Sequence, residues 1–110
     1  MGGAATHRAA VLGEAEGVYW ADIINKRLEA ISGDRTGGRR VVVSEGVVEP
    51  VGLAVEGMWL YWADRDQAMI VRVDKMTGTQ RQVVLSKVAR LSSLTGVARL
   101  DLEKVKDNPC

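Results

Sequence analysis

The sequence contains few of the residue types from which catalytic and metal sites are built. Among 110 residues there is one cysteine, Cys110, and one histidine, His7. One cysteine allows no internal disulfide. One histidine supplies no metal-binding pair, and nothing in the sequence fixes it as the base of a catalytic triad. We therefore predict a protein that is not an enzyme and that uses no metal or cofactor.

The chain also lacks a long apolar segment and an excess of charge of one sign. No segment approaches the roughly 18 apolar residues of a membrane-spanning helix, and residues 1–8 have no apolar core of the kind found in secretory signals. The 15 basic and 14 acidic residues give a formal net charge of +1. A general affinity for nucleic acid is therefore not predicted.

The sequence does contain a tetrapeptide that occurs twice, as Tyr19-Trp20-Ala21-Asp22 and as Tyr61-Trp62-Ala63-Asp64, with a period of 42 residues. A period between about 20 and 50 residues is typical of repeat architectures. Each copy is followed by an apolar segment, a Thr-Gly pair and a Val-rich segment. This is the pattern of short antiparallel strands joined by tight turns.

The two copies define two units of short strands. The strands predicted for the first unit are 18–22, 27–31 and 39–43, with 9–12 as a further candidate, and those of the second are 51–55, 58–64, 69–74 and 80–85. Pro50 lacks an amide hydrogen and is expected at the start of a strand, while Gly52 lets another backbone approach closely. A last segment, 94–100, has the pattern of the first strand of a third unit.

These residues resemble the LDL-receptor class B repeat, which forms the YWTD β-propeller. The resemblance covers about residues 9–110 and is strongest in the second unit, where Pro50-Val51-Gly52-Leu53-Ala54-Val55 precedes the tetrapeptide. That unit is most similar to the last propeller of the Wnt co-receptors, the LDL-receptor-related proteins five and six. Both tetrapeptides carry alanine (Ala21, Ala63) where the family has threonine, so a hydroxyl hydrogen bond of the family is absent.

The resemblance implies an all-β fold: part of a six-bladed propeller, with about two four-stranded antiparallel blades and one strand of a third. Its expected parts are a poorly patterned N-terminus (1–17), two blades (18–46 and 47–88), the first strand of the closing blade with its exit (89–106), and the start of a truncated EGF-like module (107–110). Since blades are stabilised by their neighbours, we expect a fragment that does not fold stably alone.

The resemblance also implies a function in binding. It places the chain in the extracellular part of a single-pass plasma-membrane protein whose signal and membrane span are absent from this sequence. A Wnt co-receptor propeller acts in Wnt signalling, binds Wnt proteins and secreted antagonists, and adjoins further blades and an EGF-like module. The alternative is a structural or endocytic YWTD-repeat protein, of the lipoprotein-receptor or basement-membrane type.

Ligands of this family bind the face formed by the loops that connect the strands, because these loops converge without disturbing the blades. The resemblance places six residues on that face: Glu49, Val51, Arg65, Asp66, Ser92 and Ser93. For each one taken singly, an ordinary solvated position is an equally good interpretation. Asp64 and Asp66 also have the form of paired metal ligands, but we interpret Asp64 as structural and Asp66 as exposed.

A second set of residues is predicted to hold the repeat together: Tyr19, Trp20, Asp22, Arg40, Tyr61, Trp62, Asp64 and Arg81. The aromatic pairs are expected to pack between blades, with their indole N–H groups bonded to carbonyl groups. A buried carboxylate needs a partner, and the two arginines of this set are the candidate partners of the two aspartates. Trp59, whose counterpart is Gly17, lies outside the repeat pattern; packing is its default interpretation, and surface binding is the alternative.

Overall fold

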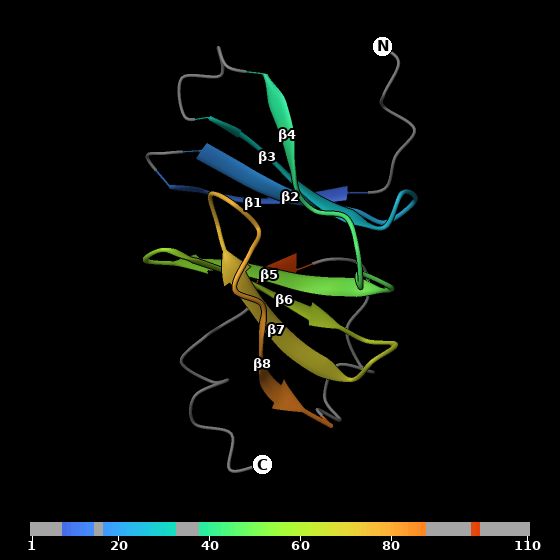
Figure 1. Ribbon diagram of the computed structural model, residues 1–110. Helices are drawn as coiled ribbons and strands as arrows, with labels where there is room; N and C mark the ends of the chain where they lie inside the picture. Colours follow the sequence, from blue (N-terminus) through green and yellow to red (C-terminus); the bar gives the residue numbers. More distant parts are fainter. Residues whose placement is uncertain (1–7, 15–16, 33–37, 88–97, 100–110) are drawn as a thin grey trace.

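The structure is a computed structural model that describes residues 8–14, 17–32, 38–87 and 98–99. Its strands form two sheets (Figure 1). The first sheet has the order β1-β2-β3-β4, with β1 at Arg8–Glu14, β2 at Gly17–Asp22, β3 at Arg27–Ser32 and β4 at Arg39–Val43. The second has the order β8-β7-β6-β5-β9, with β5 at Pro50–Glu56, β6 at Trp59–Asp64, β7 at Met69–Asp74, β8 at Gln82–Ser86 and β9 at Ala98–Arg99.

The predicted fold class is confirmed: the sheets are all-β, and consecutive strands within each four-strand unit are antiparallel. Each predicted strand of the two units is present, with ends that differ by at most two residues from the predicted ones. β9 is the described part of the predicted segment 94–100. The described residues do not include 1–7 of the predicted N-terminus or the predicted EGF-like segment 107–110. No helix in the described ranges is long and apolar enough to cross a membrane.

The 42-residue repeat is visible in the backbone as well as in the sequence. The register between β3 and β4 shifts at Leu28/Glu29, and that between β7 and β8 shifts at Ile70/Val71. The last residue of each preceding turn has a positive φ, 57° at Lys26 and 54° at Ala68. Since few non-glycine residues adopt this conformation, its recurrence shows that both units close the same turn in the same way.

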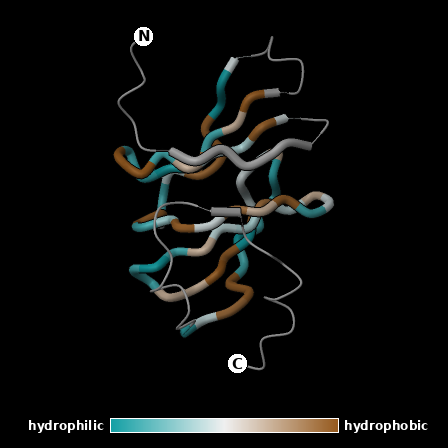
Figure 2. The backbone as a smooth tube through the Cα atoms, turned by 180° about the vertical axis from the view of Figure 1, so that it is seen from behind, coloured by the Kyte–Doolittle hydropathy of each residue, from teal (hydrophilic) through white to brown (hydrophobic). Residues whose placement is uncertain are grey.

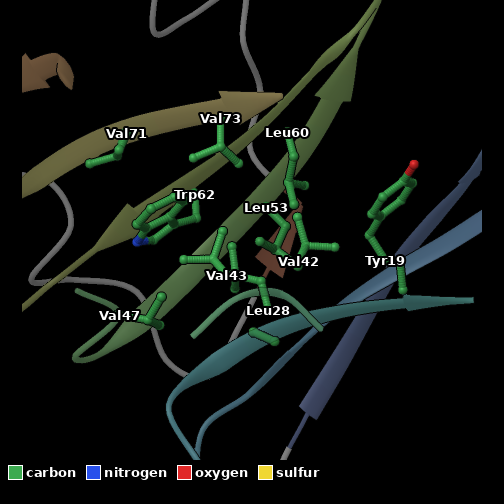
Figure 3. Close-up of a cluster of buried hydrophobic side chains, with 12 residues drawn as sticks. Tyr19, Leu28, Val42, Val43, Val47, Leu53, Leu60, Trp62, Val71 and Val73 are labelled. Atoms are coloured by element: carbon green, nitrogen blue, oxygen red, sulfur yellow. The ribbon is translucent and has the colours of Figure 1, made fainter. Parts of the chain in front are cut away.

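The two sheets pack face to face through a cluster of buried side chains, which we call the inter-sheet core (Figure 3). Successive residues of a strand point to opposite faces, so only alternate residues of a strand enter this core. Tyr19 is one of them in β2, and Trp62 is one of them in β6. The first sheet contributes Tyr19, Ala21, Leu28, Ala30, Val42 and Val43; the linker contributes Val47; the second sheet contributes Leu53, Leu60, Trp62, Val71 and Val73. The tyrosine of one unit thus packs in the same interface as the tryptophan of the next.

A second buried cluster lies on the opposite face of the second sheet, around Tyr61. The hydrophobic residues follow the strands of both sheets, whereas hydrophilic segments occur in several turns (Figure 2). β5 pairs in parallel with β9, Gly52 opposite Ala98, and β1 contacts both of these strands. The first strand of each unit therefore lies beside the first strands of the others, as around the axis of a propeller.

Candidate functional site

The turns at one end of the two sheets form the candidate binding surface. We call this surface the Asp64 rim and define it as the β2–β3 turn (residues 23–26), the segment between β4 and β5 (residues 44–49) and the β6–β7 turn (residues 65–68). These segments lie at the same end because β2, β4 and β6 all end at this side of their sheets, while β3, β5 and β7 begin there.

Asp64, the last residue of β6, joins two of these segments. Its side chain is fully buried. One carboxylate oxygen, Oδ2, accepts a hydrogen bond from the backbone N–H of Val48 at 2.8 Å. The other, Oδ1, accepts from the backbone N–H groups of Glu49 at 3.1 Å and Gln67 at 3.3 Å. Because three backbone donors converge on it, the carboxylate ties the segment between β4 and β5 to the β6–β7 turn.

Arg65 and Glu49 add further bonds between the same segments at the surface. The Arg65 backbone N–H donates to the Glu49 carbonyl oxygen at 2.9 Å, and Nε of Arg65 lies 3.1 Å from Oε2 of Glu49. The Gln67 amide donates to the carbonyl oxygen of Gly46 at 2.9 Å. The Arg65 side chain is 28% exposed and that of Glu49 is 46% exposed, so both charged groups remain partly accessible to solvent.

The first unit repeats this arrangement at Asp22. The Asp22 carboxylate accepts hydrogen bonds from the backbone N–H and the side-chain amide of Asn25, at 3.0 and 2.9 Å. Burial alone would raise the pKa of Asp22, but the two Asn25 hydrogen bonds and the nearby Arg27 guanidinium outweigh it, and the pKa is lowered from its ordinary value. The carboxylate therefore stays ionised under the turn that it holds.

The predicted pairing of these aspartates with arginines is wrong. Arg40 donates to the carbonyl oxygens of Met76 at 3.0 Å and Lys75 at 3.2 Å, in the β7–β8 turn of the other sheet. Arg81 donates to the Glu45 carbonyl oxygen at 2.6 Å. Backbone N–H groups satisfy the Asp64 carboxylate, and the backbone N–H and side-chain amide of Asn25 satisfy that of Asp22. The two arginines bind carbonyl groups across the inter-sheet boundary instead.

Trp62 differs from expectation in one respect. It is buried in the inter-sheet core as predicted, but its indole Nε1 has no hydrogen-bond partner among the residues that the structure describes. The Arg81 guanidinium lies over its ring, 5.4 Å from the centroid. Apolar packing and this cation–π contact hold the side chain, since no carbonyl group meets its N–H.

The structure brings together part of the predicted ligand face. Glu49 and Arg65 are paired on the rim, and Asp66 is exposed beside them. Val51 is 1% exposed and packs in the cluster around Tyr61. Its side chain is not on the rim, because Val51 lies within β5 and points to the buried face of that strand. Ser92 and Ser93 lie outside the described residues.

Sequence reasoning missed the part of the rim that the first unit supplies. Ile24 is 59% exposed in the β2–β3 turn, and Asn25 and Lys26 beside it are exposed as well. The repeat itself contained the signal, because Ile24 precedes Asp66 by one 42-residue period. Within the described ranges, no group of three or more His, Cys, Asp or Glu side chains is placed to hold a metal ion.

The chain is similar to several receptors. It is 40% identical over 94 residues to low-density lipoprotein receptor-related protein 5 of Mus musculus, which covers 84% of this chain and 6% of that protein. It is 35% identical over 81 residues to low-density lipoprotein receptor-related protein 4 of Homo sapiens, which covers 74% of this chain and 4% of that protein. It is 30% identical over 98 residues to the vitellogenin receptor of Solenopsis invicta, and this alignment covers 86% of this chain and 5% of that protein.

The chain thus spans only 4 to 6% of the length of these relatives. No protein-family model matches it. Among solved structures, a chain from the crystal structure of a nidogen/laminin complex is similar with a TM-score of 0.55 and 29% identity, over 66% of this chain and 28% of that one.

The three relatives are named as receptors or receptor-related proteins, which agrees with the prediction of a binding rather than a catalytic function. The solved structure shares the arrangement of the sheets at a sequence identity that is consistent with the same repeat. The chain is therefore a YWTD β-propeller region of the LDL-receptor class B type.

Proposed function

We propose that this chain is part of a receptor ectodomain and that its propeller binds extracellular protein ligands on the Asp64 rim, in a Wnt co-receptor role. In this proposal residues 18–46 and 47–88 belong to two blades of a six-bladed ring, 89–106 begin the closing blade and 107–110 begin an EGF-like module. We call the closed ring that contains these blades the intact propeller. Its ligands are Wnt proteins and secreted antagonists, and its place is outside a plasma membrane that the full protein crosses once.

The observation that carries the proposal is the set of hydrogen bonds beneath the rim. Three backbone N–H groups converge on the buried Asp64 carboxylate, and the charged and polar residues Glu49, Arg65 and Asp66 stand on the backbone that it fixes. A binding surface that is ordered before it meets its ligand loses less conformational entropy on binding. The similarity to low-density lipoprotein receptor-related protein 5 supports the Wnt co-receptor type.

A second function is favoured by the other similarities. One relative is a receptor whose name specifies vitellogenin, and the similar solved structure is of a nidogen/laminin complex. These support a structural or endocytic YWTD protein that binds a lipoprotein or a basement-membrane protein on the same rim.

Binding of the intact propeller to an immobilised Wnt protein, to vitellogenin and to laminin tests these alternatives. The Wnt co-receptor role predicts binding to the Wnt protein, weakened at least tenfold by Asp66→Lys on the rim. Gln80→Lys, which adds charge at the exposed β7–β8 turn at the other end of the sheet, is the control and should leave affinity unchanged. Binding to vitellogenin or laminin but not to the Wnt protein would establish the second function.

A further inference from the structure

The turn between β7 and β8 (residues 75–81) lies at the end of the second sheet opposite to the Asp64 rim. Asp74, the last residue of β7, holds the first half of this turn. Its Oδ1 accepts hydrogen bonds from the backbone N–H groups of Met76 at 2.8 Å and Thr77 at 3.1 Å. Its carbonyl oxygen accepts from the N–H of Gly78 at 2.7 Å. These bonds shape the backbone from which the Met76 side chain projects.

Arg40 of β4 reaches this turn across the boundary between the sheets. Its Nη1 donates to the Met76 carbonyl oxygen at 3.0 Å, and its Nη2 donates to the Lys75 carbonyl oxygen at 3.2 Å. The Met76 sulfur, Sδ, lies 3.9 Å from the same Nη2. One guanidinium of the first sheet therefore contacts two carbonyl groups and the thioether of a short segment of the second sheet.

The contact with the sulfur is the weakest of the three. A thioether is a weak hydrogen-bond acceptor, whereas oxidation to the sulfoxide makes the methionine side chain polar. Hydrogen bonds from a guanidinium to oxygen acceptors are charge-assisted and therefore stronger than neutral ones. An oxygen atom added to Sδ on the side of Arg40 would convert this weak contact into a strong hydrogen bond.

Met76 is accessible to a small oxidant. It is 59% exposed although the first sheet, its neighbour at this boundary, is in place. In the intact propeller a further sheet would pack on the far face of the second sheet. The counterpart of Met76 in the first unit, which has such a following sheet, is Asp34. A charged residue at this position indicates that the following sheet leaves it in contact with water, so we expect Met76 to stay exposed.

The pair of Arg40 and Met76 is specific to this boundary. One period after Arg40 stands Gln82, so the repeat conserves neither member of the pair. Met58, in the neighbouring β5–β6 turn, is 50% exposed, and its carbonyl oxygen accepts from the Lys75 N–H at 2.9 Å. Of these two exposed methionines in the described ranges, Met76 is the one with a guanidinium beside its sulfur. Met58 is therefore a matched control for Met76.

We propose that Met76 is a site of reversible oxidation and that Arg40 binds its sulfoxide. Hydrogen peroxide transfers one oxygen atom to Sδ: the O–O bond breaks, an S–O bond forms, and the second oxygen leaves as water with both protons. The sulfur is oxidised by two electrons and the peroxide is reduced by two. The new oxygen accepts a hydrogen bond from Nη2 of Arg40.

Oxidation at this site therefore strengthens the connection between β4 and the β7–β8 turn. This is opposite to the usual effect of methionine sulfoxide, which disrupts the packing of cores and of methionine-rich interfaces. The effect does not depend on the ligand proposed for the Asp64 rim, because the turn lies at the other end of the second sheet.

Treatment of the intact propeller with hydrogen peroxide, in the variant Met58→Leu, tests the proposal. Peptide mass spectrometry follows the oxygen added to Met76, and NMR follows hydrogen exchange of the Gly78 amide, whose bond to Asp74 requires the turn to be closed. We expect oxidation to slow this exchange by roughly fivefold or more, since a hydrogen bond to a charged group opposes opening of the turn. A methionine sulfoxide reductase should restore the original rate.

Met76→Leu, treated in the same way, is the control for oxidation elsewhere, and its Gly78 exchange should not change. Arg40→Gln, combined with Met58→Leu, has a shorter and uncharged side chain at position 40, so oxidation of Met76 should no longer slow the exchange. The NMR signal of the Arg40 Nε–H in Met58→Leu should also move on oxidation, and this readout serves if the Arg40 variant does not fold.

Three results would overturn the proposal. The first is a peroxide concentration that oxidises Met58 in the parent and leaves Met76 a thioether. The second is Gly78 exchange that stays the same or becomes faster when Met76 carries the oxygen. The third is exchange that slows equally with and without Arg40, or an Arg40 Nε–H signal that does not respond to the sulfoxide.

Discussion

The carboxylate of Asp64 and the backbone N–H of Val48 are 2.8 Å apart, which ties the end of β6 to the segment that links the two sheets. The same carboxylate also accepts from Glu49 and Gln67. Removal of this buried carboxylate would leave three backbone N–H groups without a partner away from water, which destabilises the fold.

Asp64→Ala should lower the free energy of unfolding of the intact propeller by about 2–4 kcal/mol. Asp64→Asn should also be destabilising, by about 1–3 kcal/mol, since its amide NH₂ would face donors that need an acceptor. Asp66→Asn, at an exposed position of the same turn, is the control and should stay within about 0.5 kcal/mol of the parent. Urea unfolding measures all three, and equal midpoints for Asp64→Ala and the parent would refute the role of Asp64.

The sequence predicts the strands of this fold well because the same strand pattern occurs twice, once in each unit. The tetrapeptides, the turn glycines and the alternation of Ile70 and Arg72 with Met69 and Val71 all have the same interpretation. The partners of Asp64 were not predictable in this way. Backbone N–H groups carry no sequence signal, whereas an arginine at a suitable distance along the chain does, so sequence reasoning favours the arginines.

Val51 and Ile24 show the same limit for the rim. The family pattern names positions in loops, but exposure depends on where the strand alternation begins, and Val51 falls on the buried side of β5. Ile24 is apolar, which suggests packing, but its place in a four-residue turn leaves it 59% exposed. The contacts of Arg40 and Arg81 depend on how the two sheets face each other, which no local pattern contains.

Gly78→Ala should be strongly destabilising. Gly78 has a φ of 75°, and a Cβ atom on it would collide with the carbonyl oxygen of Val42 in the other sheet. Gly57→Ala is a matched control, because Gly57 also has a positive φ, 60°, but has open space where the Cβ would be. We expect a loss of about 1 kcal/mol for Gly57→Ala from backbone strain and a loss of about 3 kcal/mol or more for Gly78→Ala, since steric overlap in a packed interface adds to that strain.

Thermal or urea unfolding of the two glycine variants makes this comparison. Similar losses for both would mean that the β7–β8 turn does not pack against β4 as closely as the structure shows. The difference between the variants is more informative than either loss alone, because the strain of a positive φ is common to both.

Trp62→Phe should be tolerated unusually well for a buried tryptophan. The indole N–H of Trp62 has no partner in the described part of the chain. Its removal should break no hydrogen bond, and the loss should be confined to packing and to the Arg81 cation–π contact. We expect a cost of about 1–2 kcal/mol. Trp62→Ala empties the position in the inter-sheet core and should cost about 3–5 kcal/mol. A phenylalanine variant as unstable as the alanine variant would show that the N–H does have a partner.

The stability of the fold should fall as the pH is lowered below about 4. The pKa of Asp22 is lowered in the folded state, where burial raises it but the Asn25 hydrogen bonds and Arg27 lower it further. The pKa of Asp74 is also lowered, first by the backbone N–H groups of Met76 and Thr77. A carboxyl whose folded pKa lies below its unfolded value, about 3.9, stabilises the fold fully above that value and loses this contribution as the pH falls through the folded pKa.

Asp22→Asn removes one of these titrations and keeps the side chain close to its original size. The variant should be less stable than the parent at pH 7, and the difference between them should shrink between pH 5 and pH 2, because protonation of Asp22 weakens the parent over that range. Asp66→Asn, the same substitution at an exposed position of the equivalent turn in the second unit, is the control. Urea midpoints measured at several pH values compare the three proteins, and a gap between Asp22→Asn and the parent that stays constant down to pH 2 would mean that the Asp22 charge contributes nothing to the turn it holds.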